Sequence, residues 1–166
     1  CGTAERVAAK CLAPGATERE HQKFAQEYDK SLRAAQQCQG VCRVYGCIRH
    51  DQALCIVMKR YDQSLHQLCY SREDPDDETR FRPLPLGEAL EIGLQIARAL
   101  AELHTVGIRV QDLKPGNLLL DKHGTLVISD FGISAIEGAT ITSTASKAAA
   151  GTSFYMCAEL FKGDPK

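Results

Sequence analysis

The sequence has no excess of charge of either sign and no long apolar run. Its 20 Lys and Arg residues oppose 21 Asp and Glu residues, for a net charge of −1, so the basic excess of nucleic-acid-binding proteins is missing. No stretch approaches the roughly 18 apolar residues that span a bilayer, and no secretory leader is visible. With 25% charged and 44% hydrophobic residues, the composition is typical of a soluble globular protein. We therefore expect neither a nucleic-acid partner nor a membrane segment.

The eight cysteines lack the paired C-x-x-C spacing of common zinc sites. The tightest cluster, Cys38, Cys42, Cys47 and His50, has steps of four, five and three residues. Cys42 and Cys55 instead lie in short apolar runs, where a free thiol behaves as a small buried hydrophobe. We predict reduced core cysteines in preference to metal ligands, and with them a reducing compartment.

The chemistry-bearing residues are concentrated in two short motifs, Val110–Asn117 and Asp130–Gly132. The first motif holds a carboxylate, a lysine and an amide, at Asp112, Lys114 and Asn117, and the aspartate of the second motif follows Asp112 by 18 residues. A phosphoryl group in transfer is highly charged and its transition state is loose. Its catalysis therefore consists of placing metal ions, a cation and a hydroxyl-orienting carboxylate around it. The two motifs predict this chemistry.

Four motifs in a fixed order carry a family resemblance. They are Val7–Lys10, Asp112–Asn117, Asp130–Gly132 and Gly151–Glu159. Their order resembles the V-A-I-K, D-x-K-P-x-N, D-F-G and G-T-x-x-Y-x-A-P-E segments of the eukaryotic-type protein kinase catalytic domain. The resemblance implies an α+β, protein kinase-like two-lobe fold. A general α+β domain with coincidental motifs is the alternative.

The resemblance covers nearly the whole chain and implies its domain organisation. Residues 1–166 form a partial protein kinase domain, with a small-lobe part at 1–58, a hinge at 59–62 and a large-lobe part at 63–166. The glycine-rich loop of the small lobe is expected to be absent, and the large lobe to be truncated after the activation segment. We interpret the chain as a central fragment with weak or no activity on its own.

Residue patterns predict the elements that hold these motifs. Thr17, with Glu20 three residues later, is a capping-box signal for the start of a helix. Leu86–His104 has helical periodicity, and Gly107 lies just beyond it as a stop signal. The predicted buried face of this helix consists of positions 86, 89, 90, 93, 96, 97, 100 and 103. The other predicted elements are a strand at 7–12, hairpins formed by 41–45 with 54–58 and by 118–120 with 126–128, and an exposed loop at 71–85.

The resemblance assigns the catalytic roles to Asp112 and Lys114. Asp112 is expected to accept or orient the proton of the acceptor hydroxyl, with a turn or capping aspartate as the alternative. Lys114 is expected to set its ammonium group against the transferring phosphate, with a solvated lysine as the alternative. The D-x-K pattern, together with Thr152, resembles the serine/threonine branch of the family.

The resemblance also implies ATP and Mg²⁺ as cofactors. Asn117 and Asp130 are expected to supply oxygen ligands to magnesium, and Lys10 to contact the α and β phosphates. Lys10 needs an acidic partner, for which Glu27, 17 residues away, is preferred and Glu20 is the competitor. The alternatives are an exposed helix charge for Glu27 and a simple turn former for Asp130.

The adenine ring is expected to lie between Ala8 and Leu119, which are otherwise ordinary core residues. The backbone of Met58–Tyr61 would read the edge of the ring. Ser31 stands four residues after Glu27, where the family usually has an apolar residue in the packed column behind the site. Leu32 is the candidate replacement.

The main departure from the family pattern is Gln111, which replaces the arginine of His-Arg-Asp and makes this a non-RD variant. That arginine pairs with a phosphorylated residue of the activation loop, a charge-assisted contact that a neutral glutamine cannot make. We predict that phosphorylation within residues 133–150 does not switch activity by this route.

The predicted function is ATP-dependent phosphoryl transfer to serine and threonine hydroxyls of protein substrates, in the cytoplasm. The alternative is a pseudokinase-like scaffold that binds nucleotide or a partner without catalysis. Catalysis is favoured because a module without chemistry has no physical need to keep all of Lys10, Asp112, Lys114, Asn117 and Asp130.

Overall fold

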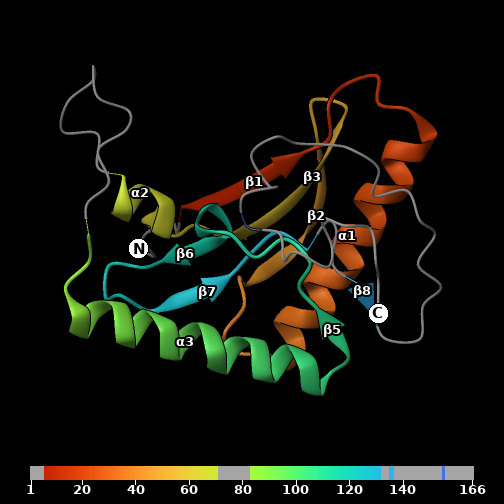
Figure 1. Ribbon diagram of the computed structural model, residues 1–166. Helices are drawn as coiled ribbons and strands as arrows, with labels where there is room; N and C mark the ends of the chain where they lie inside the picture. The colour runs from red at the N-terminus through yellow and green to blue at the C-terminus, as the bar shows by residue number, and fades with distance from the viewer. Residues whose placement is uncertain (1–5, 71–82, 132–134, 137–154, 156–166) are drawn as a thin grey trace, which may run out of the picture.

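A computed structural model describes residues 6–70, 83–131, 135–136 and 155 (Figure 1). Its first sheet contains strands β1 (Val7–Cys11), β2 (Val44–His50) and β3 (Ala53–Lys59) in the antiparallel order β1-β3-β2. A two-residue turn joins β2 to β3, and its residues Asp51 and Gln52 have φ angles of 46° and 67°. Such left-handed turns match the twist of the strands they connect. The hairpin therefore closes tightly.

The predicted strand at 41–45 is wrong in its position, because β2 begins only at Val44. The residues before it pair elsewhere: Val41 forms a parallel bridge with Ile128, and the Cys42 amide donates to the Ile128 carbonyl at 2.9 Å. Val41 and Cys42 thus pair with the second sheet and not with the hairpin partner β3. The other sheet provides the partner, which a local pattern does not reveal.

Helix α1 (Glu18–Gln37) connects β1 to β2 and begins as predicted. Thr17 is its N-cap, and both hydrogen bonds of the capping box with Glu20 are present. They satisfy backbone amides that the first turn would otherwise leave unpaired. Figure 1 shows α1 standing beside the first sheet.

The second sheet has strands β4 (Gln63–Ser64), β6 (Leu118–Leu120) and β7 (Leu126–Ile128) in the order β4-β6-β7. The β6–β7 hairpin has the bounds predicted from the sequence. Shorter elements were not predicted. They are α2 (Leu65–Cys69), the 3₁₀ turn η1 (Pro115–Asn117), and β5 (Ile108–Arg109) paired with β8 (Ala135–Ile136). With helices and antiparallel sheets together, the α+β prediction is confirmed.

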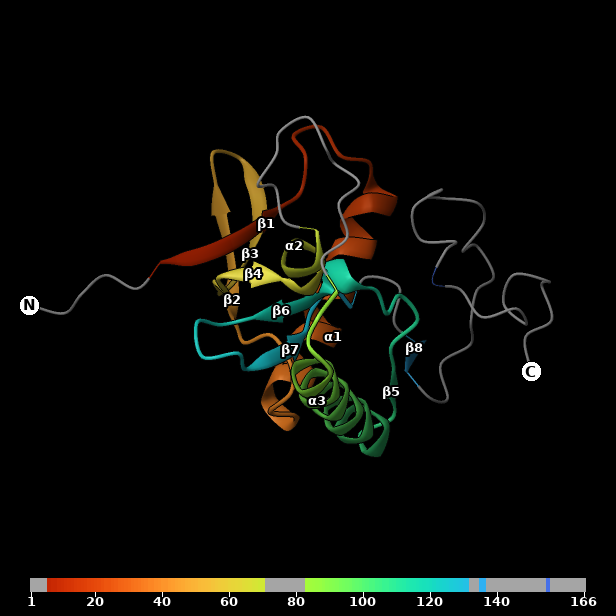
Figure 2. The same cartoon turned by 60° about the vertical axis from the view of Figure 1, so that its left-hand side comes forward.

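Helix α3 (Leu86–Thr105) packs against β7 and β5, as the turned view in Figure 2 shows for β7. Gly107 follows it with φ 72°, the left-handed conformation that commonly ends a helix. The predicted buried face is partly wrong. Leu86 and Leu90 are 75% and 64% exposed, whereas Leu103 of the same predicted face is fully buried. Ile92 and Ala99, which lie outside the predicted face, are buried as well.

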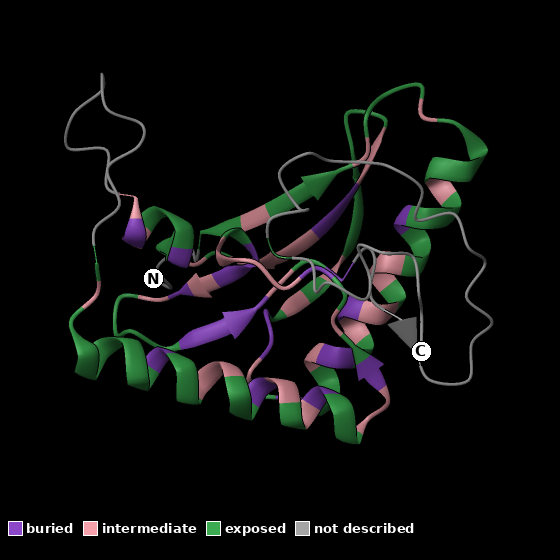
Figure 3. Ribbon diagram, in the orientation of Figure 1, coloured by how far each residue is buried: buried purple, intermediate pink, exposed green. Residues whose placement is uncertain are grey.

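A hydrophobic core packs α3 and the second sheet against the end of α1 and the segment that follows it. Ala34 and Val41 are buried together with Leu103, Ile128 and Phe131, and Figure 3 shows this buried layer along β7 and the inner side of α3. Movement of α1 relative to β7 would disrupt this packing. Among the described helices, none combines the length and the apolar character needed to cross a bilayer.

The cysteines correct one prediction. Cys11 and Cys55 form a disulfide, so these two are not reduced. They are direct cross-strand partners in the β1–β3 register, and the pairing of strands 44 residues apart is not encoded in a local pattern. Cys38, Cys42 and Cys69 are free and buried, as predicted.

Candidate active site

Three charged side chains from three different elements meet between the two sheets. The Lys10 Nζ atom on β1 lies 2.5 Å from Glu27 Oε1 on α1 and 3.2 Å from Asp130 Oδ1 just after β7. The competitor Glu20 is bound to Thr17 in the helix cap instead. The structure therefore places Glu27 beside Lys10, as the sequence favoured.

The surroundings of Lys10 keep its ammonium group charged. Burial would lower the pKa of Lys10, but the hydrogen bond to Glu27 and the negative charges of Asp130 and Glu27 outweigh burial and raise the pKa above 10.5. Each effect follows from favouring either the neutral or the charged form. A permanent positive charge therefore faces the space between the sheets at neutral pH.

Asp130 has an unusual backbone conformation. Its φ angle is 62°, a left-handed value that costs a residue with a Cβ of order 1–3 kcal/mol and persists only where the surroundings impose it. The surroundings here are buried Phe131, 2% exposed, and Ser129, whose amide and hydroxyl both donate to the Asn117 carbonyl at 2.8 and 3.0 Å. These contacts fix the carboxylate of Asp130 next to the loop that carries Asn117.

The predicted catalytic loop forms a compact network around Asp112. Its Oδ2 atom accepts hydrogen bonds from Lys114 Nζ at 2.6 Å and from Asn117 Nδ2 at 3.2 Å. The Asn117 amide also donates to the Asp112 carbonyl at 2.9 Å. The second carboxylate oxygen, Oδ1, is buried and has no hydrogen-bond partner among the described residues. A buried carboxylate oxygen without a donor is costly, so a further hydrogen-bond donor at this atom would be stabilising.

A cleft of about 320 Å³ lies between the sheets, within the size range of small-molecule sites. Seven predicted site residues line it: Ala8, Lys10, Glu27, Met58, Asn117, Leu119 and Asp130. Ala8 lies directly opposite Met58 in the β1–β3 register, while Leu119 comes from the second sheet. Asp112 and Lys114 do not line the cleft and are connected to it through Asn117.

Seven lining residues were not among the predicted contacts: Ala9, Ser31, Cys42, Val44, Ile56, Ser129 and Phe131. Ser31 is 8% exposed and lines the cleft, so the proposed replacement by Leu32 is wrong. Burial raises the pKa of Cys42 to about 11, which keeps this thiol neutral. The alternation of inward residues along a strand could have identified Val44 and Ile56.

Metal binding by protein side chains alone is not indicated. Within the described ranges, no group of three or more His, Cys, Asp or Glu residues is arranged to hold an ion, and this includes the cluster at Cys38–His50. The oxygens of Asn117 and Asp130 are hard ligands of the kind that magnesium takes together with phosphate oxygens. Two residues of the family motifs, Gly132 and Thr152, lie outside the described residues. The segment 137–154 and nearly all of the predicted loop at 71–85 lie outside them as well.

The family described as "Protein kinase domain" matches residues 2–166. The chain therefore belongs to the protein kinase domain family, and the protein kinase-like α+β fold predicted from the motifs is confirmed. The chain is similar to parts of several longer proteins. The E3 ubiquitin-protein ligase KEG of Arabidopsis thaliana is 35% identical over 104 residues, which is 63% of this chain and 6% of the relative.

The second relative, named a probable serine/threonine-protein kinase of Dictyostelium discoideum, is 34% identical over 125 residues, or 72% of this chain and 9% of the relative. The third, serine/threonine-protein kinase PknK of Mycobacterium tuberculosis, is 39% identical over 84 residues, or 51% of this chain and 7% of the relative. The chain spans less than a tenth of the length of each of these three proteins.

Proposed function

We propose that this protein transfers the γ-phosphoryl group of ATP to serine or threonine hydroxyls of protein substrates. The observation that carries the proposal is the convergence of Lys10, Glu27 and Asp130 on one cleft. Asp112, which is hydrogen-bonded to the lining residue Asn117, has one carboxylate oxygen without a partner among the described residues. Membership of the kinase family supports phosphoryl transfer, and the serine/threonine kinases among its relatives support the acceptor.

In this proposal, the cleft binds ATP with its adenine ring between Ala8 and Leu119. Both residues are apolar, line the cleft and come from different sheets. The ammonium group of Lys10 then faces the phosphates, and Glu27, whose side chain is 13% exposed, holds that group in place. A fixed cation opposite phosphate oxygens favours binding in an orientation that suits transfer.

Asn117 and Asp130 would hold Mg²⁺ by their side-chain oxygens. Bound magnesium supplies positive charge to the phosphate oxygens as negative charge develops on them. The Asn117 side-chain nitrogen is already used by Asp112, so the amide is oriented by the catalytic loop. The left-handed backbone of Asp130 fixes the second ligand.

Asp112 and Lys114 complete the proposed chemistry on the side of the acceptor. Oδ2 of Asp112 is engaged by Lys114 and Asn117, so Oδ1 is the atom that accepts the hydroxyl proton. Lys114 holds the carboxylate and neutralises charge near the transferring group. The protein substrate needs a serine or threonine hydroxyl that reaches this oxygen.

The alternative is a pseudokinase-like module that binds nucleotide or a partner without catalysis. Gln111 favours it, because a neutral side chain replaces the family's arginine beside the catalytic aspartate. A cytoplasmic location is part of the main proposal. Free buried Cys38, Cys42 and Cys69 fit a reducing compartment.

The test is transfer of labelled γ-phosphate from ATP to casein by the full-length protein, followed by phosphoamino acid analysis. The proposal expects label on serine and threonine only, and only when magnesium is present. Binding of ATP without any transfer to protein would support the scaffold alternative and reject the enzyme. Label on tyrosine alone would reject the serine/threonine assignment.

A further inference from the structure

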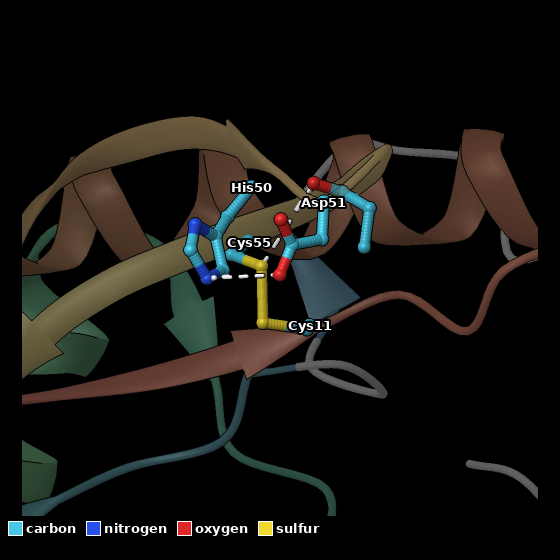
Figure 4. The surroundings of a disulfide bond; sticks show 5 residues. Cys11, His50, Asp51 and Cys55 are labelled. Atoms are coloured by element: carbon cyan, nitrogen blue, oxygen red, sulfur yellow. Dashed lines mark hydrogen bonds and ion pairs between the residues drawn. A yellow bond between two sulfur atoms is a disulfide. The ribbon is translucent and has the colours of Figure 1, made fainter.

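The Cys11–Cys55 disulfide lies beside the lysine of the site. Figure 4 shows the bridge between Cys11 on β1 and Cys55 on β3. Cys11 is the residue after Lys10, and the β1–β3 register pairs Lys10 with Ile56 and Cys11 with Cys55. Successive side chains of a strand point to opposite faces. Lys10 and Ile56 line the cleft, whereas neither cysteine of the disulfide does. The bridge therefore lies outside the lining of the cleft, directly beside Lys10 in the sequence.

The two sulfur-bearing residues differ in accessibility. Cys11 is an exposed residue at the end of β1, whereas Cys55 is 1% exposed in the core of β3. Because an incoming thiolate attacks the more accessible sulfur, the more exposed residue, Cys11, is the expected point of attack. Burial raises the pKa of free Cys38, Cys42 and Cys69, so these thiols stay protonated and are poor competitors for exchange.

Strand β1 buries little of its own surface. Four of its five residues are exposed, so the strand buries little apolar surface and is held mainly by hydrogen bonds to β3. The bridge closes the last pair of the register, and Leu12 then donates to the Leu54 carbonyl at 2.8 Å. Beyond it the chain turns into the cap of α1, the helix that carries Glu27. Lys10, the residue before Cys11, is thus positioned at the bridged end of the strand.

We propose that Cys11 and Cys55 form a thiol–disulfide exchange site, on which a dithiol reductant acts to loosen the strand that carries Lys10 and so weaken nucleotide binding. Intracellular disulfides, where they occur, are commonly transient and redox-sensing. The consequence for nucleotide binding rests on the function proposed above. The exchange itself and the loosening of β1 do not.

The exchange balances as a two-electron reduction. One thiolate of the dithiol attacks Cys11 Sγ, the Cys11–Cys55 bond breaks, and Cys55 leaves as a thiolate that takes up a proton. The second thiol of the reductant then attacks the mixed disulfide, releases Cys11, and leaves the reductant as a cyclic disulfide. The protein gains two electrons and two protons, and the dithiol loses them.

The first experiment measures the exchange and the strand directly, in the full-length protein with dithiothreitol as the dithiol. Peptide mapping should find Cys11 linked to Cys55 before treatment and both cysteines alkylated afterwards. Hydrogen exchange of the β1 amides should then accelerate in the wild type but show no response to dithiothreitol in Cys11→Ser. A pair that is never linked, or β1 protection that is unchanged after reduction, would overturn the proposal.

The second experiment measures the dissociation constant of ATP with magnesium in both redox states. Reduction should weaken binding about tenfold, because the binding-competent strand is then populated only part of the time. Cys11→Ser and Cys55→Ser should match the reduced wild type in both states. The matched control Cys47→Ser removes an exposed free thiol of β2 and should keep the full response.

The two proposals fail separately. Equal ATP affinity in both redox states of the wild type would overturn the effect on nucleotide binding and leave the proposed function intact. No ATP binding in either state would overturn the proposed function, and the hydrogen-exchange result would then decide on the exchange site.

Discussion

Lys10 Nζ lies 3.2 Å from Asp130 Oδ1, although the two residues are 120 positions apart in the sequence. One comes from the first sheet and the other follows the last strand of the second, so this pair spans the cleft. Both side chains are more than 40% exposed, at 43% and 42%. Exposed ion pairs contribute little to stability. Breaking this pair would therefore cost little, so that Lys10 can bind a ligand's phosphate and Asp130 its metal ion.

Asp130→Asn should therefore separate stability from ligand binding. The free energy of unfolding should change by less than about 1 kcal/mol, whereas the magnesium dependence of ATP affinity should be lost, because the neutral amide is a poorer metal ligand. Calorimetric titration with and without magnesium measures the second effect. Asp29→Asn, an exposed position of α1 outside the cleft, is the control. Intact magnesium dependence in Asp130→Asn would remove this residue from the site.

Ser31 is a buried polar residue in the lining of the cleft. It is 8% exposed and lines the same space as Phe131. Ser31→Leu should bury additional apolar surface and raise the free energy of unfolding by about 1–2 kcal/mol, measured by denaturant titration. Gln26→Leu, on the exposed side of α1, should give no comparable gain. A loss of stability in Ser31→Leu would show that the cleft has no room for the larger side chain.

Glu102 anchors the connection between α1 and β2 to α3. Its Oε2 atom accepts hydrogen bonds from the amides of Gln39 at 2.7 Å and Gly40 at 3.1 Å. Gly40 approaches the helix so closely that a Cβ there would lie 2.4 Å from Ala99 Cβ. Glu102→Ala should cost about 1–3 kcal/mol, because it leaves both amides unpaired.

Glu102→Gln should cost less, because it retains an acceptor oxygen for the two amides. Thermal and denaturant unfolding measure both variants, with Glu91→Ala on the exposed side of α3 as the comparison. Equal losses in Glu102→Ala and Glu91→Ala would argue against an anchoring role for Glu102.

The ion pairs of Lys10 stabilise the folded protein only while Lys10 is protonated, so their contribution is lost at alkaline pH. Because its pKa in the folded protein is raised above the ordinary 10.5, their contribution is complete below pH 10.5 and disappears as the pH rises through the higher folded-state value. The difference in melting temperature between wild type and Lys10→Met should therefore be constant from about pH 8 to 10 and shrink above that. A difference that already shrinks below pH 9 would mean that the pKa is lowered.

Local sequence patterns correctly predicted the structural features that are determined by neighbouring residues. The Thr17–Glu20 cap, the stop at Gly107 and the β6–β7 hairpin each depend on residues within a few positions, and all three are present in the structure. Of the charged residues that the resemblance assigned to the site, Lys10, Glu27 and Asp130 line the cleft, whereas Asp112 and Lys114 do not.

The errors concern contacts between distant segments. Cys11 pairs with Cys55 because of a strand register, and β2 starts late because Val41 pairs with Ile128 in the other sheet. The predicted face of α3 contained Leu86 and Leu90 because periodicity shows which residues share a side, but not which side meets the core. The position of each of these residues depends on a partner that is distant in the sequence, and local patterns do not identify that partner.

The central claim is that Asp112, next to the cleft that holds Lys10 and Asp130, takes the proton of the acceptor hydroxyl. Its most direct test is a single-turnover measurement of phosphoryl transfer in the full-length protein after ATP and magnesium have bound, comparing wild type with Asp112→Asn. The account predicts unchanged ATP affinity and a transfer rate lowered on the order of 10²-fold or more. Transfer at the full wild-type rate in Asp112→Asn would contradict it.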